Sequence, residues 1–549
     1  MITVGLYGIT DTTHGADPTW THDHGVAVMR GGTVLSVVEL ERWTGRKHDN
    51  RLPRFIHEIL DALVPPDEAV RFVSVNSFAG STFLSADGNL RIEPDGKVVI
   101  GSILTPARVR WFPDGMTRRA AEGWIMSHEF AHLASILPFT GRFEPGALLA
   151  HIDGGASDSA ASFWEMTAAG PRLIEASWNR LKTPVNNFNV NPLVRAILGF
   201  EACQHLAIPG QLMGYAGWGQ PRPEMCEWLA ENGWFLDRTD NHRALLSAIN
   251  ERFRTDHVVF RPHEPLFRDL CASIQAFFEA EVVGAIRQEA ERIGAHGLFY
   301  AGGAGLNIPT NVKLELLFDR VHIPPATNDS GLALGAAAWL EYLEHGSLQP
   351  HGPFLNRFSV PTEAPSEADI PEVAELLAAG KVVGVCNGAA EVGPRALGHR
   401  SILARADDVD LRRKVSEHLK QREWYRPLAP VIAAEVAAEV LGPDAGTSAL
   451  APFMLGAWPV RAAWRGALQG VMHADGTVRA QVIHAGLAED EWLRHLLFHL
   501  RERYGLPGLI NTSFNPRGRA IVHRHEDAIP LARSMGLDAV VVHGSLHRP

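Results

Sequence analysis

The sequence predicts an α/β protein with two domains, of which the first contains a duplicated unit. A chain of 549 residues is too long for one ordinary hydrophobic core, so two or three domains are expected. Short apolar runs with strand character alternate with longer amphipathic segments along the chain. An apolar strand, a turn and a hairpin occur in the same order near residues 2 and 147, which indicates an internal repeat.

The first half is predicted to form strands, hairpins and one long helix. A polar insertion at 10–21 follows the first strand, and an Asp-Gly-Gly turn at 153–155 follows the corresponding strand of the second repeat. Residues 266–293 place Leu270 and Ile274 on one stripe of an amphipathic helix. Such a duplication is typical of the two lobes of an actin-like ATPase. The expected strands are 2–8, 26–29, 33–38, 147–152, 162–166 and 297–300.

Residues 346–369 are expected to link the two domains, because proline, glycine and serine replace periodic apolar residues there. This linker divides the chain into a first domain at 1–345 and a second domain at 370–549. The second domain is predicted to begin with a helix at 371–379 and a strand at 381–386.

The composition, with 46% hydrophobic and 21% charged residues, is that of a soluble globular protein. A net charge of −11 excludes a global basic field for nucleic acid or anionic membranes. The four cysteines have no CxxC spacing and fit free thiols in a reducing cytoplasm. The first strand lacks the features of a signal peptide, and no apolar run reaches the roughly 18–20 residues of a membrane helix. A cytoplasmic location without a membrane partner is expected.

The pair His128 and His132 is the most informative feature of the first domain. Histidines at i and i+4 lie on one face of a helix, so that their rings can converge on one ion. Asp153 follows an apolar strand and Asp329 precedes a small-residue helix, and both carboxylates suit the remaining ligand positions. Imidazole with carboxylate favours a first-row metal such as iron or zinc over magnesium or calcium. Taken alone, the pair is also compatible with ordinary surface or core histidines.

Glycines follow the strand predicted at 297–300. Gly302 and Gly303 would allow backbone N–H groups to approach a phosphate closely, although many strand-to-helix turns need glycine only for packing.

A dense cluster of cations marks the second domain, which is unusual in an acidic protein. Guanidinium groups bind phosphate oxygens bidentately and lysine adds a point charge, so the cluster predicts a nucleotide or acyl-phosphate pocket. The alternative is a solvated basic face. Near the C-terminus, Asn511, Ser513 and Asn515 alternate along a strand and suit either a polar ligand edge or a sheet-end hydrogen-bond network. The cations are Arg395, Arg400, Lys420, Arg422 and Arg426.

These motifs resemble the O-carbamoyltransferase family typified by nodulation protein U and the cephamycin and tobramycin carbamoyltransferases. The most specific are Glu391–Gly398 with Arg400-Ser401, then Arg422–Pro427, then Asn511–Asn515. The resemblance implies a first domain similar to the tRNA-threonylcarbamoylation ATPase Kae1 and a second domain resembling YrdC. It implies that the second domain forms carbamoyl adenylate from carbamoyl phosphate and Mg²⁺-bound ATP. The first domain, with an Fe²⁺-type metal, would then transfer the carbamoyl group to a hydroxyl of a small molecule in secondary metabolism, such as an antibiotic precursor.

The resemblance also implies roles for individual residues. The implied metal ligands are His128, His132, Asp153 and Asp329. Residues implied to lie near the adenylate in the first domain are Gly154, Gly302, Gly303 and Asn307. Residues implied to lie at the transfer site are His22, Asp23 and Lys47. The implied carbamoyl phosphate and ATP pocket contains Arg395, Arg400, Ser401, Lys420, Arg422, Arg426, Asn511, Ser513 and Asn515.

We expect His22 to be the general base, because a histidine titrates near neutrality and the acceptor hydroxyl must lose a proton. His24 is a rival, since the insertion at 10–21 shifts the alignment. Gln211 occupies a position where the family has a lysine, which puts a phosphate contact there in doubt. Residues 188–190 lie in a stretch that often shapes the acceptor pocket.

An actin-like ATPase or sugar kinase with an appended nucleotide-binding domain is the main alternative, although a kinase needs no second phosphate cluster. A fused tRNA-threonylcarbamoylation enzyme is disfavoured by the charge of −11. The expected partners are therefore carbamoyl phosphate, ATP and a hydroxylated acceptor, without nucleic acid. A homodimer is compatible with the size.

Overall fold

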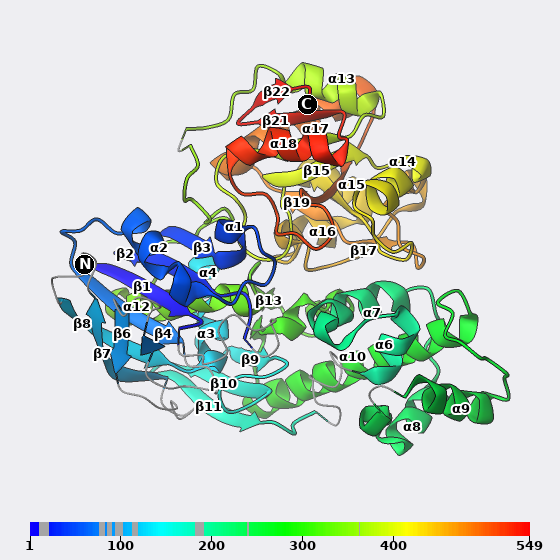
Figure 1. Cartoon of the computed structure of the whole chain (residues 1–549), viewed down its shortest axis with the longest axis horizontal. Helices are drawn as coiled ribbons and strands as arrows, with labels where there is room; N and C mark the ends of the chain where they lie inside the picture. The colour runs from blue at the N-terminus through cyan, green and yellow to red at the C-terminus, as the bar shows by residue number, and fades with distance from the viewer. Residues whose placement is uncertain are drawn as a thin grey trace.

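The computed structural model describes residues 1–9, 21–75, 83–84, 90–93, 103–111, 119–181, 191–238, 241–361 and 363–549. The insertion at 10–20 and residues 188–190 lie outside these ranges. Figure 1 shows the first half of the chain, in blue to green, below a second body in yellow to red.

The first sheet has eight strands in the order β3-β2-β1-β4-β8-β7-β6-β5. Strands β1, β2 and β3 are antiparallel neighbours, whereas β4 and β8 continue the sheet parallel to β1. The strand bounds are β1 (Ile2–Tyr7), β2 (Gly25–Arg30), β3 (Thr33–Glu39), β4 (Val70–Val75), β5 (Phe83–Leu84), β6 (Leu90–Glu93), β7 (Leu104–Trp111) and β8 (Arg119–Met126).

The second sheet repeats the topology of the first. Its order is β11-β10-β9-β12-β13, with an antiparallel meander β9-β10-β11 and with β12 and β13 parallel to β9. The predicted duplication is therefore confirmed by strand order and direction. The strand bounds are β9 (Leu148–Ile152), β10 (Ala161–Thr167), β11 (Gly170–Ser177), β12 (Gly297–Ala301) and β13 (Arg320–His322).

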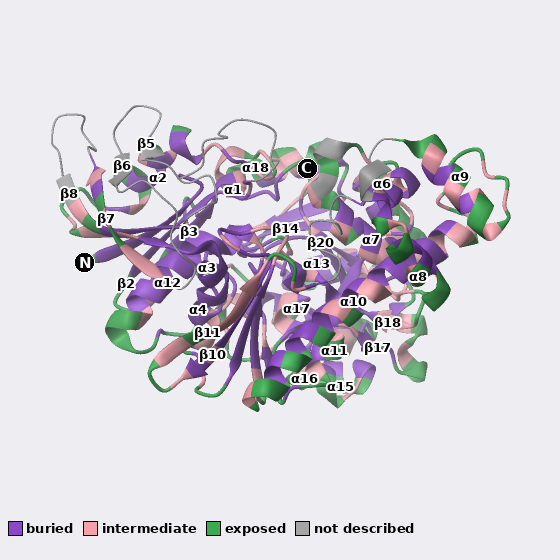
Figure 2. Cartoon of the chain, turned by 90° about the horizontal axis from the view of Figure 1, so that it is seen from below, coloured by how far each residue is buried: buried purple, intermediate pink, exposed green. Residues whose placement is uncertain are grey.

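Two helices exchange between the repeats. Helix α12 (Leu332–His345) ends the second repeat but packs on β1, β2 and β4 of the first sheet. Helix α3 (His128–Ala134) ends the first repeat but packs on β9 and β12 of the second sheet, and the two helices contact each other. Residues of both sheets and both helices form one buried cluster, visible as purple ribbon in Figure 2.

The remaining helices of the first half lie outside the sheets. The predicted helix at 266–293 is α10 (Pro265–Ile293), and its buried residues pack against α7 and α8. The other helices are α1 (Leu40–Thr44), α2 (Ile56–Leu63), α4 (Leu137–Thr140), α6 (Pro192–Leu198), α7 (Ile208–Ala216), α8 (Pro223–Glu231), α9 (His242–Phe253) and α11 (Ile308–Glu315). No helix among the described residues is long and apolar enough to cross a membrane.

The second half is a separate seven-stranded mixed sheet in the order β19-β16-β20-β15-β14-β21-β22. The predicted strand before residue 387 is β14, and the strand carrying Asn511 and Ser513 is β20. The strand bounds are β14 (Val383–Cys386), β15 (Arg400–Arg405), β16 (Ala429–Ala433), β19 (Gln481–Ile483), β20 (Leu509–Ser513), β21 (Ala539–Val542) and β22 (Ser545–His547). A short hairpin adds β17 (Trp458–Pro459) and β18 (Thr477–Val478).

Helices cover both faces of this sheet. Helices α13 (Ile370–Ala378) and α17 (Glu491–Tyr504) contribute apolar residues to one core cluster, and α15 (Ala434–Leu441) and α18 (His525–Met535) to another. Two short helices, α14 (Val409–Arg413) and α16 (Pro443–Thr447), complete this half.

The segment predicted as a linker is not a loose connection. Phe354 and Phe358 are buried, and their rings stack on His399 and His523 with centroids 3.6 and 3.7 Å apart. Asn356 donates to Glu39 of the first half and forms an isolated bridge with Ala390 of the second. Aromatic stacking and buried hydrogen bonds thus fix a segment whose proline content suggested only a spacer.

The crossing of α3 and α12 yields a stability prediction at Gly335. A Cβ at this position would collide with the backbone carbonyl of Ala131 on α3. We expect Gly335→Ala to lower the free energy of unfolding by about 1–3 kcal/mol or more, because the two helices must separate. Denaturant unfolding monitored by circular dichroism measures this loss.

Gly284→Ala is the matched control, since Gly284 is exposed in α10 with open space at its Cβ. Alanine there should stabilise slightly, by about 0.5–1 kcal/mol. Equal effects of the two substitutions would contradict the close crossing.

Candidate functional site

Four predicted metal ligands from separate segments converge between the two repeats. His128 and His132 extend from α3, with their Nε2 atoms 3.1 Å apart. The His132 Nε2 atom lies 3.4 Å from Asp153 Oδ2 and 3.4 Å from Asp329 Oδ1, and His128 Nε2 lies 3.7 Å from Asp329 Oδ1. All four side chains are at most 14% exposed.

This donor set fits a first-row metal ion. Ligand atoms bound at about 2.0–2.2 Å around one ion lie roughly 3.0–3.5 Å from each other, which is close to the observed separations. Two buried imidazole nitrogens face each other at hydrogen-bond distance beside two carboxylates, and a cation between them would satisfy all four groups. The bound metal itself remains a prediction.

Backbone and side-chain contacts fix both carboxylates. Tyr7, at the end of β1, donates from its hydroxyl to Asp329 Oδ2 at 2.7 Å, which leaves Oδ1 facing the histidines. Gly303 N donates to Asp153 Oδ2 at 2.5 Å. Burial opposes the charge of Asp329, but the charge of His22 and hydrogen bonds from the α3 histidines hold its pKa well below the usual range.

His22 and Asp23 lie next to this centre. The Asp23 carboxylate bonds His22 Nδ1 at 3.1 Å and His48 Nδ1 at 2.8 Å, and it accepts from Asn328 Nδ2 at 3.0 Å. Burial opposes protonation of His22, but Asp329 and Asp23 outweigh it and raise its pKa to about 9. Asp23 and His48 both have positive φ, so the carboxylate is held at the cost of backbone strain.

His22 and His24, the two histidines considered as the base, differ in their exposure. His24 is fully buried against Tyr7 and would be displaced by any side chain at Gly8, whereas the His22 side chain is 20% exposed. Lys47, also predicted at this site, is exposed and contributes to lowering the pKa of Lys420 in the second half, so it faces the boundary between the halves.

The predicted adenylate loop adjoins the metal centre. Gly302 has φ +102°, and a Cβ there would collide with the Ile152 carbonyl, so this turn requires glycine. Gly154 follows Asp153 directly. Asn307 differs from the expectation: its amide oxygen caps α11 by accepting from Thr310 N, and the same amide bonds Gln275.

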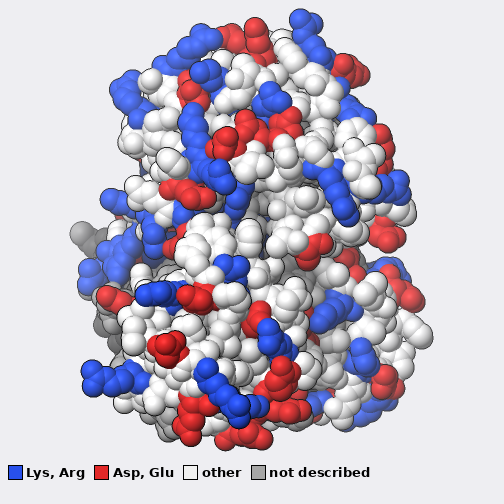
Figure 3. Space-filling model, turned by 90° about the vertical axis from the view of Figure 1, so that its right-hand side faces the viewer, with Lys and Arg blue, Asp and Glu red and all other residues white. Residues whose placement is uncertain are grey.

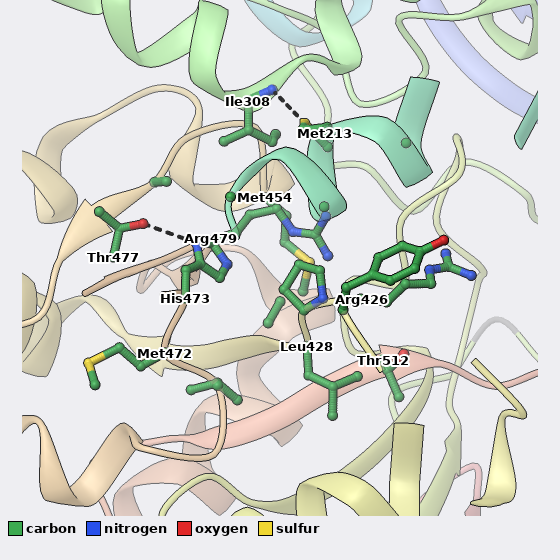
Figure 4. A pocket seen from close by; sticks show the side chains of 18 of the residues that line it. Met213, Ile308, Arg426, Leu428, Met454, Met472, His473, Thr477, Arg479 and Thr512 are labelled. Atoms are coloured by element: carbon green, nitrogen blue, oxygen red, sulfur yellow. Dashed lines mark hydrogen bonds between the residues drawn. The ribbon is translucent and has the colours of Figure 1, made fainter. Parts of the chain in front are cut away.

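A cavity of about 410 Å³ lies where the two halves meet. Its walls combine Met213 and Ile308 of the first half with Met454 and Met472 of the second, and the Met213 sulfur accepts from Ile308 N (Figure 4). Its volume is in the range of small-molecule and cofactor sites. Apolar walls and cationic side chains thus share one enclosed space.

Five arginines line this cavity: Arg412 and a group formed by Arg395, Arg422, Arg426 and Arg479. Burial and mutual repulsion lower the pKa of each arginine in this group, to about 10 for Arg395. Among described residues, only Arg426 has an acidic partner within 4 Å, Glu423 at 3.8 Å. On the face drawn in Figure 3, acidic and basic side chains are interspersed, so no continuous basic surface covers that face. The lining holds more cations than anions, with Asp475 its only acidic residue among those described, and such a cluster fits phosphate.

Lys420, Ser513 and Asn515 form a hydrogen-bonded group at the end of β20. Lys420 Nζ donates to the Ser513 carbonyl and hydroxyl and to both oxygens of Asn515. Asn511 lines the cavity but donates to Gln481 at 2.6 Å and to the Ala396 carbonyl. Asn511 and Ser513 line the cavity, whereas Lys420 and Asn515 belong to the sheet-end network without lining it.

Arg400 is a correction to the predicted phosphate set. Its guanidinium is fully buried and donates four of its five N–H groups to the carbonyls of His523, Asn387, His399 and Gly388, and the residue does not line the cavity. Ser401 is also buried, and its hydroxyl accepts from Gly398 N. Both residues shape the loop after β14 instead of lining the cavity.

Other residues depart from the motifs or were missed. Gln211, in place of the family lysine, donates to Glu423 across the boundary. Arg479 and His473 line the cavity but were not predicted, although His473-x-Asp-Gly-Thr is a recognisable polar turn. His48 was not predicted, because sequence spacing does not indicate its bond to Asp23.

The duplicated fold and the two sites define an enzyme of group transfer, and comparison with known proteins specifies the family. Residues 126–338 match the family model "Carbamoyltransferase N-terminus" and residues 374–548 match "Carbamoyltransferase C-terminus". Nodulation protein U of Sinorhizobium fredii is 34% identical over 91% of this chain and 93% of its own. Nodulation protein NolNO of the same species is 29% identical over 99% of this chain and 82% of its own. The chain belongs to the carbamoyltransferase family and is a carbamoyl-transferring enzyme.

The solved structures similar to this chain have lower sequence identity to it than these nodulation proteins. Component A of (R)-2-hydroxyglutaryl-CoA dehydratase from Acidaminococcus fermentans has a TM-score of 0.32 and 15% identity, covering 63% of this chain and all but 1% of its own. Full-length HypF in its phosphate- and nucleotide-bound form has a TM-score of 0.31 and 14% identity. The match covers 63% of this chain and 56% of the HypF chain.

The pKa of His22 predicts a pH-dependent stability in the metal-free protein. Because folding raises this pKa from 6.5 to about 9, the stabilisation is complete below pH 6.5 and is lost as the pH rises through 9. We expect His22→Asn to remove up to about 3 kcal/mol of stability at pH 6 and little at pH 10. Denaturant unfolding of both proteins across this range tests the expectation. A constant difference between them would contradict it.

Proposed function

We propose that this enzyme is an ATP-dependent O-carbamoyltransferase with two separate chemical sites. The cavity between the halves would form carbamoyl adenylate, and the histidine–carboxylate centre would pass the carbamoyl group to a hydroxyl of a small molecule. In balance, carbamoyl phosphate, ATP and water give carbamoyl adenylate, pyrophosphate and phosphate. The adenylate and an alcohol then give the carbamate ester and AMP. The cluster of cations, which outnumber the acidic residues beside them, is the observation that carries the proposal.

Adenylate formation brings two anions together, and the cavity residues suit that task. Water would release phosphate from carbamoyl phosphate to give carbamate, and a carbamate oxygen would attack the α-phosphorus of ATP and displace pyrophosphate. Fixed guanidinium groups offset the repulsion between these anions and orient that attack. Their depressed pKa values record the cost of holding cations together in a buried space, and binding phosphates would relieve it. The apolar walls formed by Met213, Ile308 and Met454 offer a surface for an adenine ring.

The transfer step requires deprotonation of an alcohol beside a polarised carbonyl. His128, His132, Asp153 and Asp329 would hold an Fe²⁺-type ion, which supplies Lewis-acid polarisation when bound. With a cation bound, the Asp329 and Asp153 charges that help raise the pKa of His22 would be offset, which would favour its neutral form. Neutral His22 would accept the hydroxyl proton at Nε2, because Asp23 occupies its Nδ1. The acceptor is a hydroxylated small molecule, such as a sugar or another natural product.

Arg479 tests the adenylation site. Arg479→Gln should reduce carbamoyl-phosphate-dependent release of AMP and pyrophosphate on the order of 100-fold, because one preorganised cation is lost. Arg413→Gln is the matched control: Arg413 is exposed, pairs with Asp410 and lies outside the cavity. Wild-type turnover of ATP to ADP without carbamoyl phosphate would instead indicate a kinase and overturn the proposal.

His22 tests the transfer site. His22→Asn should form carbamoyl adenylate normally while transfer to an acceptor alcohol falls about 100-fold or more, since general base catalysis typically contributes 10²–10⁴-fold. Quenched-flow measurement of adenylate and carbamate ester separates the two steps. Transfer at the wild-type rate would remove His22 from the mechanism. His24→Asn is not a matched control, because that side chain is buried.

A further inference from the structure

His151 is a fully buried histidine that the proposed reaction does not use. It lies on β9, two residues before Asp153, and in a strand such residues point to the same face. Helix α3 packs on this strand, so the face that carries Asp153 is the one that meets His128 and His132.

The hydrogen bonds of His151 leave one ring nitrogen without a partner. Its Nδ1 lies 3.4 Å from the Ser162 hydroxyl on the neighbouring strand β10. The same hydroxyl accepts from Trp164 Nε1 at 3.2 Å and keeps a second lone pair that can accept from His151. In the tautomer in which Nδ1 donates to Ser162, Nε2 carries a buried lone pair that has no hydrogen-bond partner among the described residues.

Histidines that bind metals share this arrangement. One ring nitrogen binds the ion while the other donates to a fixed acceptor that sets the tautomer and the ring orientation. A buried acceptor without a donor is otherwise costly and calls for an unobserved partner.

The position of the ring supplies the second argument. The rings of His151 and His132 have centroids 5.3 Å apart and an interplanar angle of 24°. Ligand atoms of His132, His151 and Asp153 all lie within 4.8 Å of one another. Opposite ligands of an ion bound at about 2.1 Å are roughly 4.2 Å apart, so a small rotation of the ring brings Nε2 into the same shell.

We propose that His151 is a fifth ligand of the metal centre and binds the ion through Nε2. This inference rests on the metal centre of the proposed function and adds a third imidazole to it. Three imidazoles and two carboxylates leave one position of a six-coordinate ion open for a substrate oxygen. A strand pair His151-x-Asp153 would then complement the helical pair His128-x₃-His132.

Metal binding tests this inference without any activity assay. The full-length protein is loaded with Zn²⁺, and extended X-ray absorption counts the bound imidazoles. We expect three in the wild type and two in His151→Phe. The variant should also bind Zn²⁺ more weakly in chelator competition, by more than the roughly 10- to 100-fold typical of losing a partner of a ligand. Two imidazoles in the wild type, or unchanged affinity in the variant, would overturn the proposal.

Ser162→Ala is the matched control, because it removes the acceptor of Nδ1 and retains Nε2. It should weaken binding by a smaller factor and keep three imidazoles. Circular dichroism of the metal-free proteins identifies a variant that fails to fold. In that case the number of imidazoles bound to Zn²⁺ in the wild type decides the proposal by itself. If the wild type bound no metal, the whole metal centre of the proposed function would be refuted. If it bound metal through two imidazoles, only the role of His151 would be refuted.

Discussion

The exchange of α3 and α12 between the two sheets is the constraint on which the first domain depends. Each helix ends one repeat and packs on the sheet of the other, so the last residues of each repeat are held at the junction. The histidine pair arrives on α3, Asp329 immediately precedes α12, and Asp153 follows the first strand of the second sheet. No single segment forms the centre, and the chain must complete both repeats before the ligands meet.

The second constraint is electrostatic. The guanidinium groups that line the cavity are half-buried and have few carboxylate partners, which is costly, and their depressed pKa values express that cost. These arginines come from the second half of the chain, and residues of the first half complete the walls of the cavity in which they lie. An anion that enters such a cavity relieves repulsion and meets little competition from water, so affinity for phosphates follows from the same strain. The proposed adenylate chemistry would therefore depend on contact between the two domains.

Sequence analysis predicted features whose causes are local. The i,i+4 spacing predicted that His128 and His132 share a helix face, and apolar periodicity predicted α10 almost to its ends. Arg400 was wrongly assigned because an arginine that satisfies backbone carbonyls has the same local sequence as one that binds phosphate. Arg479 and His48 were missed because their neighbours are distant in the chain. The ordered segment at 346–369 depends on aromatic stacking that no local pattern reveals.

The division of labour between the two sites is the central claim. It is tested most directly by exchange of labelled pyrophosphate into ATP, with carbamoyl phosphate present, in enzyme stripped of its transition metal but supplied with Mg²⁺. The account predicts that exchange continues at the rate of the metal-loaded enzyme while carbamoylation of an alcohol stops. Loss of exchange together with transfer would contradict it, because one metal-dependent site would then perform both steps.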